Sequence, residues 1–320
     1  MKRVHKTSAA LAAAFAIMNL SKPSPAAAPG WLWPVADRDP SLVSVMTYNV
    51  KGLPFPVATG RPKALAQIGR RLGALRRQGR QPDVVLLQEA FTPQAKAIAR
   101  LAGYPYVVFG PSPDDASSEA AGRWVDSGLA ILSDHPIRNV QRMTFAQDAC
   151  AGFDCLAAKG VVLAWLDIPG RDRPLAIADT HMNARGASGV AVELADAAYA
   201  RQAAAARRFI AAQLRPDTDV IFGGDFNLGT IPARIAALSD AGGIVAEAHE
   251  ATASASCTPC EQTMQDDIAA IRKRAKDKQY FHAGAPGSLR LERLSVPFGS
   301  KDGGDMLSDH LGFVADYRLK

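Results

Sequence analysis

Four apolar stretches of the sequence end in a side chain that could bind a metal ion or carry a proton, and a fifth begins with one. These side chains are Asn49 in "TYNV", Glu89 in "LLQEAF", His181 and Asn183 in "ADTHMN", Asp225 and Asn227 in "GGDFNLG", and Asp309 and His310 in "LSDHLG". Each has an ordinary explanation alone. The asparagine and the glycine of "TYNVKGLP" both favour turns. Glu89 could open a helix, and His181 could be a structural histidine. Five such sites in one chain indicate a shared function at a sheet edge.

The residue types at these five sites suit metal-assisted hydrolysis. Carboxylate and amide oxygens are the ligands preferred by Mg²⁺, with Mn²⁺ or Ca²⁺ as alternatives. Imidazoles beside such an ion can take a proton from water and stabilise developing charge. The sequence contains no Walker loop, no G-x-S-x-G elbow and no dinucleotide fingerprint. The combination therefore predicts a metal-dependent hydrolase of phosphate esters.

The elements that must position these residues alternate between strands and helices. Helical spacing of apolar residues predicts helices over 61–79, 92–103 and about 190–214, and a fourth begins near 265. Strands are expected near 42–49, 82–91, 104–110, 127–133, 160–168, 174–183, 218–229, 277–284, 290–296 and 308–319. No repeat of fixed period and no interdomain linker interrupts this order. The pattern favours one α/β domain with two packed sheets and helices outside.

The first 28 residues are typical of a secretory signal peptide. A basic start is followed by the apolar run 7–20 and by small residues, so we expect cleavage near 26–28. The apolar run is short for a membrane span, and a retained anchor is the weaker alternative. We expect a linker over 29–41, a single domain over 42–320, and a secreted or periplasmic protein.

Composition permits a large core and gives little sign of a nucleic-acid partner. Hydrophobic residues make up 48% of the 320 residues, and charged residues make up 21%. The net charge of +6 falls to about +2 without residues 1–28, because 33 basic residues then face 31 acidic ones. Arginine-rich runs at 70–80 and 272–274 could bind nucleic acid if they shared one face. Such runs are more often the solvated faces of helices.

The four cysteines form two close pairs, Cys150 with Cys155 and Cys257 with Cys260. Export would allow disulfides, and four cysteines permit three pairings, of which we expect the two local ones. A zinc site is weaker because no histidine is suitably spaced. A redox role for "CTPC" also stays open, although no thioredoxin-like unit surrounds it.

In this order, "TYNV", "LLQEAF", "GGDFNLG" and "SDHLG" resemble the motifs of the endonuclease/exonuclease/phosphatase superfamily. The resemblance covers about residues 42–320. It implies a four-layered α/β/β/α sandwich, in which two packed mixed β-sheets carry helices on their outer faces. The resemblance also places the active site at one end of the two sheets.

The resemblance assigns metal and phosphate contacts to four residues. It makes Glu89 the principal metal ligand, with Asn49 next to it binding metal or phosphate. Asp309 would complete the metal-facing cluster, and His181 would stabilise charge on the phosphoryl group.

Four further residues would handle water and protons. The resemblance implies that Asp225 and Asn227 orient the attacking water and the phosphate, and that His310 is the general base. Asp277 in "KDKQYF" resembles the carboxylate that fixes the tautomer of that histidine, as in hydrolase triads. The family usually has this aspartate in a compact "DYI" or "DRI" setting, so this match is looser.

Three more stretches, "NVKGLP", "DSGLAILSDHPI" and "CLAAKGVVLAWLDI", are similar to the secreted bacterial neutral sphingomyelinases. This likeness adds Lys159 and Asn183 as candidate substrate-binding residues. Those enzymes carry a long aromatic hairpin before the final "SDH", whereas "RLSVPFGSKDGGDM" has Phe298 as its only aromatic residue. Because membrane affinity scales with buried apolar area, this loop alone predicts at most peripheral membrane contact.

Three functions therefore stay open. The favoured one is a secreted, monomeric, Mg²⁺-dependent phosphodiesterase that acts on a phospholipid headgroup in the manner of a sphingomyelinase. A secreted metal-dependent nuclease is the alternative. A non-catalytic binding module of the same fold is the least favoured.

Overall fold

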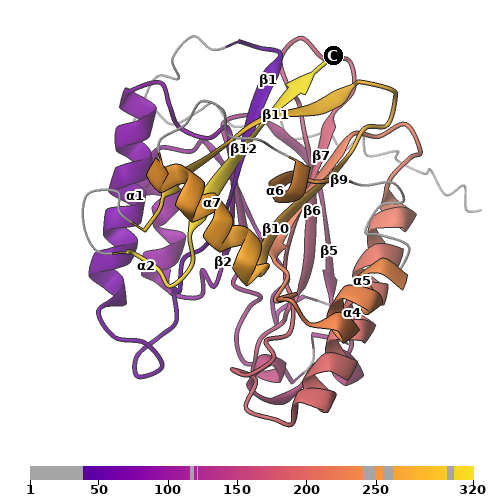
Figure 1. The fold of residues 1–320 in the computed structure, drawn as a ribbon. Helices are drawn as coiled ribbons and strands as arrows, with labels where there is room; N and C mark the ends of the chain where they lie inside the picture. Colours follow the sequence, from indigo (N-terminus) through magenta and orange to yellow (C-terminus); the bar gives the residue numbers. More distant parts are fainter. Residues whose placement is uncertain (1–38, 116–118, 121, 241–248, 255–261, 301–305) are drawn as a thin grey trace, which may run out of the picture.

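The computed structural model describes residues 39–115, 119–120, 122–240, 249–254, 262–300 and 306–320. The expected signal peptide and most of the expected linker lie outside these residues. Two six-stranded mixed sheets pack face to face, with helices on their outer faces (Figure 1). The predicted α/β sandwich is thereby confirmed.

The first sheet has the strand order β11-β12-β1-β2-β4-β3, and the second has the order β5-β6-β7-β8-β10-β9. The strands are β1 Leu42–Asn49, β2 Val84–Gln88, β3 Tyr106–Phe109, β4 Ala130–Ser133, β5 Ile137–Thr144, β6 Gly160–Leu166, β7 Leu175–His181, β8 Val220–Asp225, β9 His249–Glu250, β10 Asp277–His282, β11 Leu289–Phe298 and β12 Gly312–Leu319. Neighbouring strands are parallel in the pairs β1–β2 and β7–β8. The carboxyl ends of all four of these central strands lie at one end of the sandwich.

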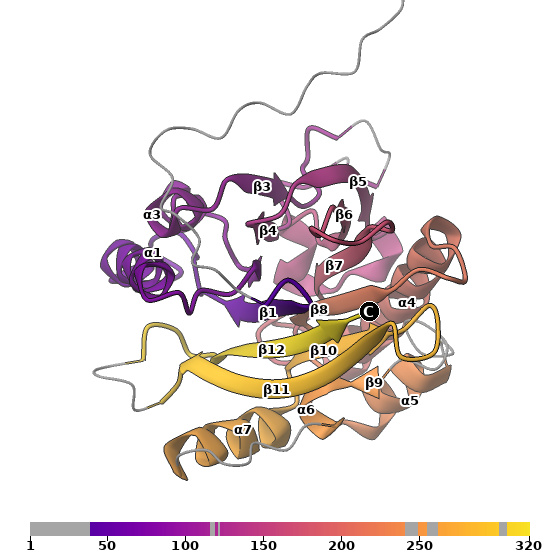
Figure 2. The ribbon, with the colours of Figure 1, turned by 90° about the horizontal axis from the view of Figure 1, so that it is seen from above.

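The helices of the described residues are α1 Arg61–Arg77, α2 Pro93–Lys96, α3 Ile98–Ala102, α4 Val192–Gln213, α5 Pro232–Asp240, α6 Ala251–Ser254 and α7 Gln262–Arg274, with short 3₁₀ turns at Gln147–Ala149 and Gly152–Leu156. The view from above shows α1 and α3 on the outside of the first sheet and α4 and α5 on the outside of the second (Figure 2). In that view, α6 and α7 lie beside β11 and β9, so they close a side of the sandwich. No helix among the described residues is long and apolar enough to cross a membrane.

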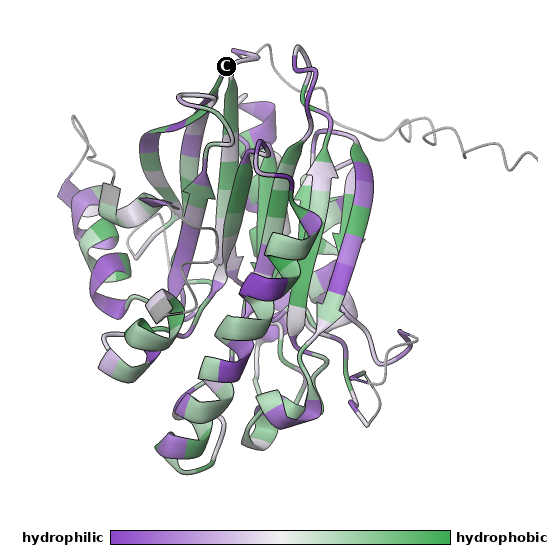
Figure 3. Cartoon of the chain, turned by 90° about the vertical axis from the view of Figure 1, so that its right-hand side faces the viewer, coloured by the Kyte–Doolittle hydropathy of each residue, from purple (hydrophilic) through white to green (hydrophobic). Residues whose placement is uncertain are grey.

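Three hydrophobic clusters hold the layers together. One lies between the sheets, one between the first sheet and α1 with α3, and one between the second sheet and α4. The central strands are buried on both faces, which explains their continuous apolar sequences. Colouring by hydropathy shows hydrophobic strands in the interior and helices with mixed faces outside (Figure 3).

Strands β5 and β9 and helices α5 and α6 were not predicted, and the expected helix 92–103 is divided. Strand β5 is an edge strand whose exposed side chains include Arg138 and Asn139, so it lacks the apolar run of a buried strand. Thr92 caps α2 as expected, accepting a hydrogen bond from the Ala95 amide, but a turn at Ala97 separates α2 from α3.

Candidate active site

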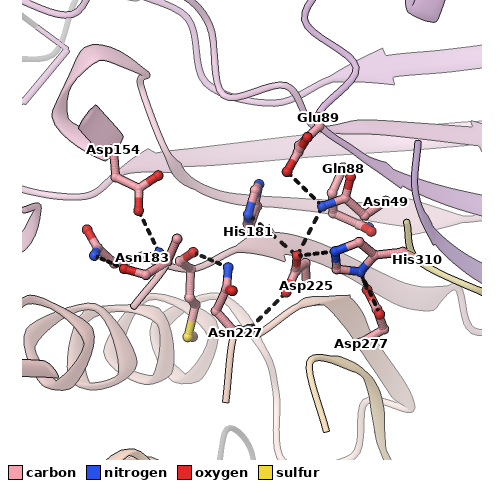
Figure 4. A network of polar contacts seen from close by, with 12 residues as sticks. Asn49, Gln88, Glu89, Asp154, His181, Asn183, Asp225, Asn227, Asp277 and His310 are labelled. Atoms are coloured by element: carbon pink, nitrogen blue, oxygen red, sulfur yellow. Dashed lines mark hydrogen bonds and ion pairs between the residues drawn. The ribbon is translucent and has the colours of Figure 1, made fainter. Parts of the chain in front are cut away.

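The candidate active site lies at the end of the sandwich where β1, β2, β7 and β8 finish. Asn49 is the last residue of β1, and Glu89 directly follows β2. His181 and Asp225 are the last residues of β7 and β8 and pair in register, while Asp277 opens β10 opposite Asp225. Strand pairing therefore brings five of the sequence-predicted residues to one place (Figure 4).

The backbone is unusual at two of the site residues. Glu89 has a φ of 57° and Asn227 a φ of 46°, in the left-handed region that non-glycine residues seldom occupy. Such conformations persist only where the surrounding structure enforces them, and they cluster at functional sites. Gly52 serves this geometry, because a Cβ there would lie 2.5 Å from the carbonyl oxygen of Glu89. The glycine of "TYNVKGLP" is therefore required by the close approach of two backbones.

Asp225 is the centre of the polar network. The Asn49 side-chain amide donates to Asp225 Oδ2 and to Glu89 Oε1, each at 3.0 Å. The backbone amide of Asn227 donates to Asp225 Oδ1 at 2.9 Å. His181 Nε2 and His310 Nε2 lie 3.6 and 3.7 Å from Asp225 Oδ2. The Asp225 carboxylate thus lies between both histidines, and the hydrogen bond from Asn49 holds it in place.

His310 is oriented by Asp277. Its Nδ1 lies 2.9 and 2.8 Å from the two carboxylate oxygens of Asp277, so Nε2 is the ring nitrogen that faces Asp225. Burial alone would lower the pKa of His310, but Asp277 and Asp225 outweigh burial and raise that pKa to about 9. Asp277 thus makes the contact that the expected orienting role requires.

The surroundings of His181 shift its pKa in the opposite direction. Burial, helped by the ammonium of Lys159, lowers the pKa of His181 to about 4. Its Nδ1 is buried and has no hydrogen-bond partner among the described residues. His181 is therefore neutral in the range where His310 carries a proton.

Lys159 and Asn183 lie beside this network rather than within it. The Lys159 ammonium pairs with Asp154 Oδ1 at 2.6 Å and donates to the carbonyl of Met182. Asn183 Oδ1 accepts from the amide of Ala151, and its Nδ2 donates to the Ala184 carbonyl. Both side chains are engaged by the protein itself, and their expected roles in substrate binding stay predictions.

Asp309 lies on the rim of the site. Its side chain is 55% exposed and pairs with Lys51 at 2.9 Å. Both residues line an open cavity of about 570 Å³ that also includes Arg61, Arg274 and Ser308. The expected contribution of Asp309 to a metal cluster stays a prediction.

The charges of the site fit a divalent cation. No lysine or arginine among the described residues forms an ion pair with Glu89, Asp225 or Asp277, and burial raises the pKa of Glu89. Ligand atoms of Asp225, Asp277 and His310 lie within 4.8 Å of one another. Because both oxygens of Asp277 face His310, Glu89 and Asp225 are the carboxylates best placed for an ion. Oxygen donors of this kind suit Mg²⁺.

The side chain of Asn49 presents its NH₂ group to both of these carboxylates. Its Oδ1 accepts from the backbone amide of Lys51 at 3.0 Å. In this orientation Asn49 positions Glu89 and Asp225, and a direct bond from its oxygen to a metal would require the amide to turn over. Its role as a ligand stays a prediction.

Sequence reasoning missed two groups of residues near the site. Lys51, Arg61 and Arg274 supply the cations of the open cavity. Arg274 belongs to the run 272–274, which the sequence offered only as a possible nucleic-acid contact, and the position of Lys51 within "TYNVKGLP" could have indicated a place near the site. Gln88 donates to Asp179 Oδ1 at 2.8 Å in the buried layer beneath the site. Gln88 and Asp179 are polar residues within apolar runs. Gln88 directly precedes Glu89, and Asp179 lies just before His181, so this pattern in the sequence could have identified them.

One expected disulfide is present close to the site. Cys150 and Cys155 are joined, with an S–S distance of 2.04 Å. The guanidinium of Arg123 donates to Cys150 Sγ and to the Cys155 carbonyl, which ties this loop to the preceding one. The pair Cys257 and Cys260 lies outside the described residues.

Comparison with known proteins identifies a family and relatives. Residues 46–244 match the family model described as "Endonuclease/Exonuclease/phosphatase family". A sphingomyelinase of Mycobacterium bovis is 28% identical over 188 residues, which cover 58% of this chain and 34% of that protein. The chain thus matches only about a third of the length of this curated relative.

Solved structures share the fold. Sphingomyelinase C from Streptomyces griseocarneus has a TM-score of 0.61 at 22% identity, covering 86% of this chain and 99% of its own. A Staphylococcus aureus beta toxin with bound magnesium ions has a TM-score of 0.60 at 18% identity, covering 87% and 99%. Danio rerio TDP2, complexed with a single-strand DNA product, has a TM-score of 0.59 at 18% identity, covering 87% and 100%. The chain belongs to the endonuclease/exonuclease/phosphatase family, whose enzymes are phosphoric ester hydrolases.

Proposed function

We propose that the chain is a Mg²⁺-dependent phosphodiesterase that cleaves a phospholipid headgroup in the manner of a sphingomyelinase. The observation that carries this proposal is the placement of two histidines with opposite electrostatics on either side of Asp225, next to Glu89. A phosphodiester placed there meets a neutral imidazole on one side and a carboxylate-supported imidazole on the other. This arrangement suits attack by water on phosphorus and departure of an alcohol.

Each residue has a defined part in this reaction. Glu89 and Asp225 would hold the divalent cation, which neutralises phosphate oxygens when bound. Asp225 and Asn227 orient the attacking water. His310 acts from its neutral form, whose share grows as pH rises toward its pKa of about 9: its Nε2 accepts the proton of the water while Asp277 holds the Nδ1 proton. Water oxygen bonds to phosphorus as the bond from phosphorus to the alcohol oxygen breaks. The leaving oxygen takes up a proton from solvent, and His310 later returns its proton to solvent. Neutral His181 stabilises the charge that develops on the phosphoryl oxygens.

Two comparisons support different substrates. The sphingomyelinase relative supports a phospholipid, and the TDP2 structure with its DNA product supports the alternative, a nuclease of the same fold. We favour the phospholipid because the similarity to sphingomyelinase is found in the sequence, whereas the similarity to TDP2 at 18% identity concerns the fold. The leader-like residues 1–28 support secretion, and we propose a monomer.

The experiment that tests this function offers purified protein sphingomyelin, duplex DNA, single-stranded DNA and an inositol phosphate, each with Mg²⁺ and with chelator. The proposal expects metal-dependent release of a phosphorylated headgroup from sphingomyelin. Cleavage of DNA alone would support the nuclease, and hydrolysis that survives the chelator would contradict the metal requirement. His310→Ala serves as the control for contaminating activity.

A further inference from the structure

The large hydrophobic side chains that are exposed in this protein gather at one end of the molecule. Among the described residues, eleven such side chains are exposed. They are Phe55, Val57, Phe109, Trp124, Val125, Phe153, Leu156, Val192, Leu194, Ile235 and Met306. Phe55 and Trp124 are 82% and 81% exposed, and Val57 and Phe153 are each 70% exposed. Single exposed hydrophobic residues are normal, but a shared location is informative.

The strand topology places all eleven at the active-site end. β1, β2, β3, β7 and β8 finish there, and β4, β6 and β12 begin there. The eleven residues lie on the connections at these strand ends, at the end of β3, or in the first turns of α4 and α5. In Figure 1 the connections from β1 to α1 and from β5 to β6 both lie at the lower end, away from the C-terminus.

The opposite end has a different surface. The described connections there expose no large hydrophobic side chain, and this end carries ion pairs such as Arg138 with Asp167 and Arg173 with Asp217. The two ends are made by the same strands, so the asymmetry is a property of the connecting sequences and requires its own explanation.

Two of the hydrophobic connections are fixed to one another. The Trp124 amide donates to the Leu156 carbonyl at 2.8 Å, and the Ala158 amide donates to the Val125 carbonyl at 2.9 Å. The Phe153 amide donates to the Ser188 carbonyl at 2.9 Å. These bonds form a preorganised ridge, so little conformational entropy would be lost when it meets a partner.

A second group of exposed residues lies beside the open cavity at Asp309. Val57 and Met306 line this cavity together with three cations, Lys51, Arg61 and Arg274. Phe55 is two residues from Val57 on the same connection. Apolar groups beside cations match a lipid surface, because the side chains can enter the headgroup layer while the cations face lipid phosphates.

We propose that this end of the molecule docks on a lipid bilayer that contains anionic lipids, with Phe55, Trp124 and Phe153 as the main inserting residues. This inference extends the proposed function, on which it depends for the idea that the substrate lies in that bilayer. It places membrane contact on the β1–α1, β3–β4 and β5–β6 connections, whereas the sequence directed attention to the loop before "SDH".

The kinds of residue favour lipid over nucleic acid. A platform for single-stranded nucleic acid needs aromatic rings on which bases stack, but seven of the eleven exposed residues are aliphatic or methionine. Aromatic and aliphatic residues distributed over several connections suit a broad, fluid surface, because a bilayer interface accommodates inserted side chains of different shapes at separate points.

The test measures binding to vesicles without any need for catalysis. Full-length protein is sedimented with vesicles of phosphatidylcholine alone and of phosphatidylcholine with phosphatidylserine, at low and high salt. We expect Phe55→Ser, Trp124→Ser and Phe153→Ser together to weaken binding to the mixed vesicles by at least roughly tenfold. Arg173→Ser, at the opposite end, is the matched control and should bind as the unaltered protein does.

Melting profiles and hydrolysis of a water-soluble phosphodiester show whether the triple variant is folded and active. Unchanged vesicle binding by a folded triple variant would overturn the proposal, as would equal weakening by Arg173→Ser. Binding of single-stranded DNA in place of vesicles, lost in the triple variant, would also overturn it and identify this end as a nucleic-acid platform. Vesicle binding by a protein that hydrolyses no phosphodiester would uphold the docking surface and reject the proposed function.

Discussion

The two sides of Asp225 differ in a way that the residue types alone do not reveal. Each side presents a buried histidine whose Nε2 lies within 3.7 Å of the same carboxylate oxygen. On one side, Asp277 raises the pKa of His310 to about 9 against the effect of burial. On the other, burial and the nearby Lys159 lower the pKa of His181 to about 4. The neighbours of each histidine therefore set its protonation state.

In the proposed reaction, this difference suits the two histidines to separate tasks. A carboxylate beside a histidine makes its neutral imidazole a stronger base, and the water-activating group acts from that neutral form. A neutral histidine can donate a hydrogen bond to a phosphoryl oxygen without releasing its proton. Pairs of titratable groups whose pKa values are driven apart often mark such a division.

Of the changes that test this difference, replacing His310 should lower the rate of hydrolysis most. We expect His310→Ala to lower kcat by about 10² to 10⁴, because a positioned base typically contributes that much. Steady-state hydrolysis at saturating Mg²⁺ measures the loss. A decrease of less than tenfold, in a variant that melts like the unaltered protein, would remove His310 from the proton transfer.

Asp277→Asn should lower kcat less than His310→Ala does, and it should act on the same proton transfer. Removing the carboxylate removes the main cause that raises the pKa of His310, so the midpoint of the rising pH–rate profile should move to lower pH. The double variant should be no slower than His310→Ala, because groups that act as a unit are not additive. Losses that multiply, or a midpoint that stays in place, would show that Asp277 does not act through His310.

The strand-end residues could be predicted from the sequence because each follows its own apolar run. The chain order of these runs, compared with the family motifs, also predicted the sandwich. Asp277 was the loosest match, yet it opens β10 directly opposite Asp225. The use of Asn183 could not be predicted, since its partner Ala151 comes from a different connection. Lys159 pairs with Asp154 on its own connection, and the short 3₁₀ turn at Gly152–Leu156 that holds Asp154 there was not predicted.

The sequence also could not predict which connections would lie together and expose hydrophobic side chains. Trp124 and Phe153 stand 29 positions apart, and only backbone hydrogen bonds between their connections show that they share one ridge. Similarly, β5 escaped prediction because an edge strand with exposed polar residues has no apolar pattern to identify it.

The smallest expected effect lies one layer beneath the site. Burial raises the pKa of Asp179 well above its usual range, so the folded protein holds this proton to higher pH than the unfolded chain, which ionises it near pH 4. That difference costs stability as pH rises. Asp179→Asn should therefore raise the free energy of unfolding by about 1 to 3 kcal/mol at neutral pH, with less gain near pH 4.

Urea unfolding at pH 4 and pH 7 measures this change. A gain that is equal at both pH values, or a loss that grows with pH, would mean that Asp179 is ionised in the folded protein. Gln88 would then be donating to a carboxylate.

The central claim is that a divalent cation bound next to Glu89 and Asp225 enables hydrolysis between the two histidines. Glu89→Gln tests it most directly, because the change removes the charge and keeps the shape. Calorimetric titration with Mg²⁺, paired with turnover of sphingomyelin, should show weakened metal binding and a collapse of activity with an unchanged melting profile. Wild-type metal affinity and turnover in that variant would contradict the account.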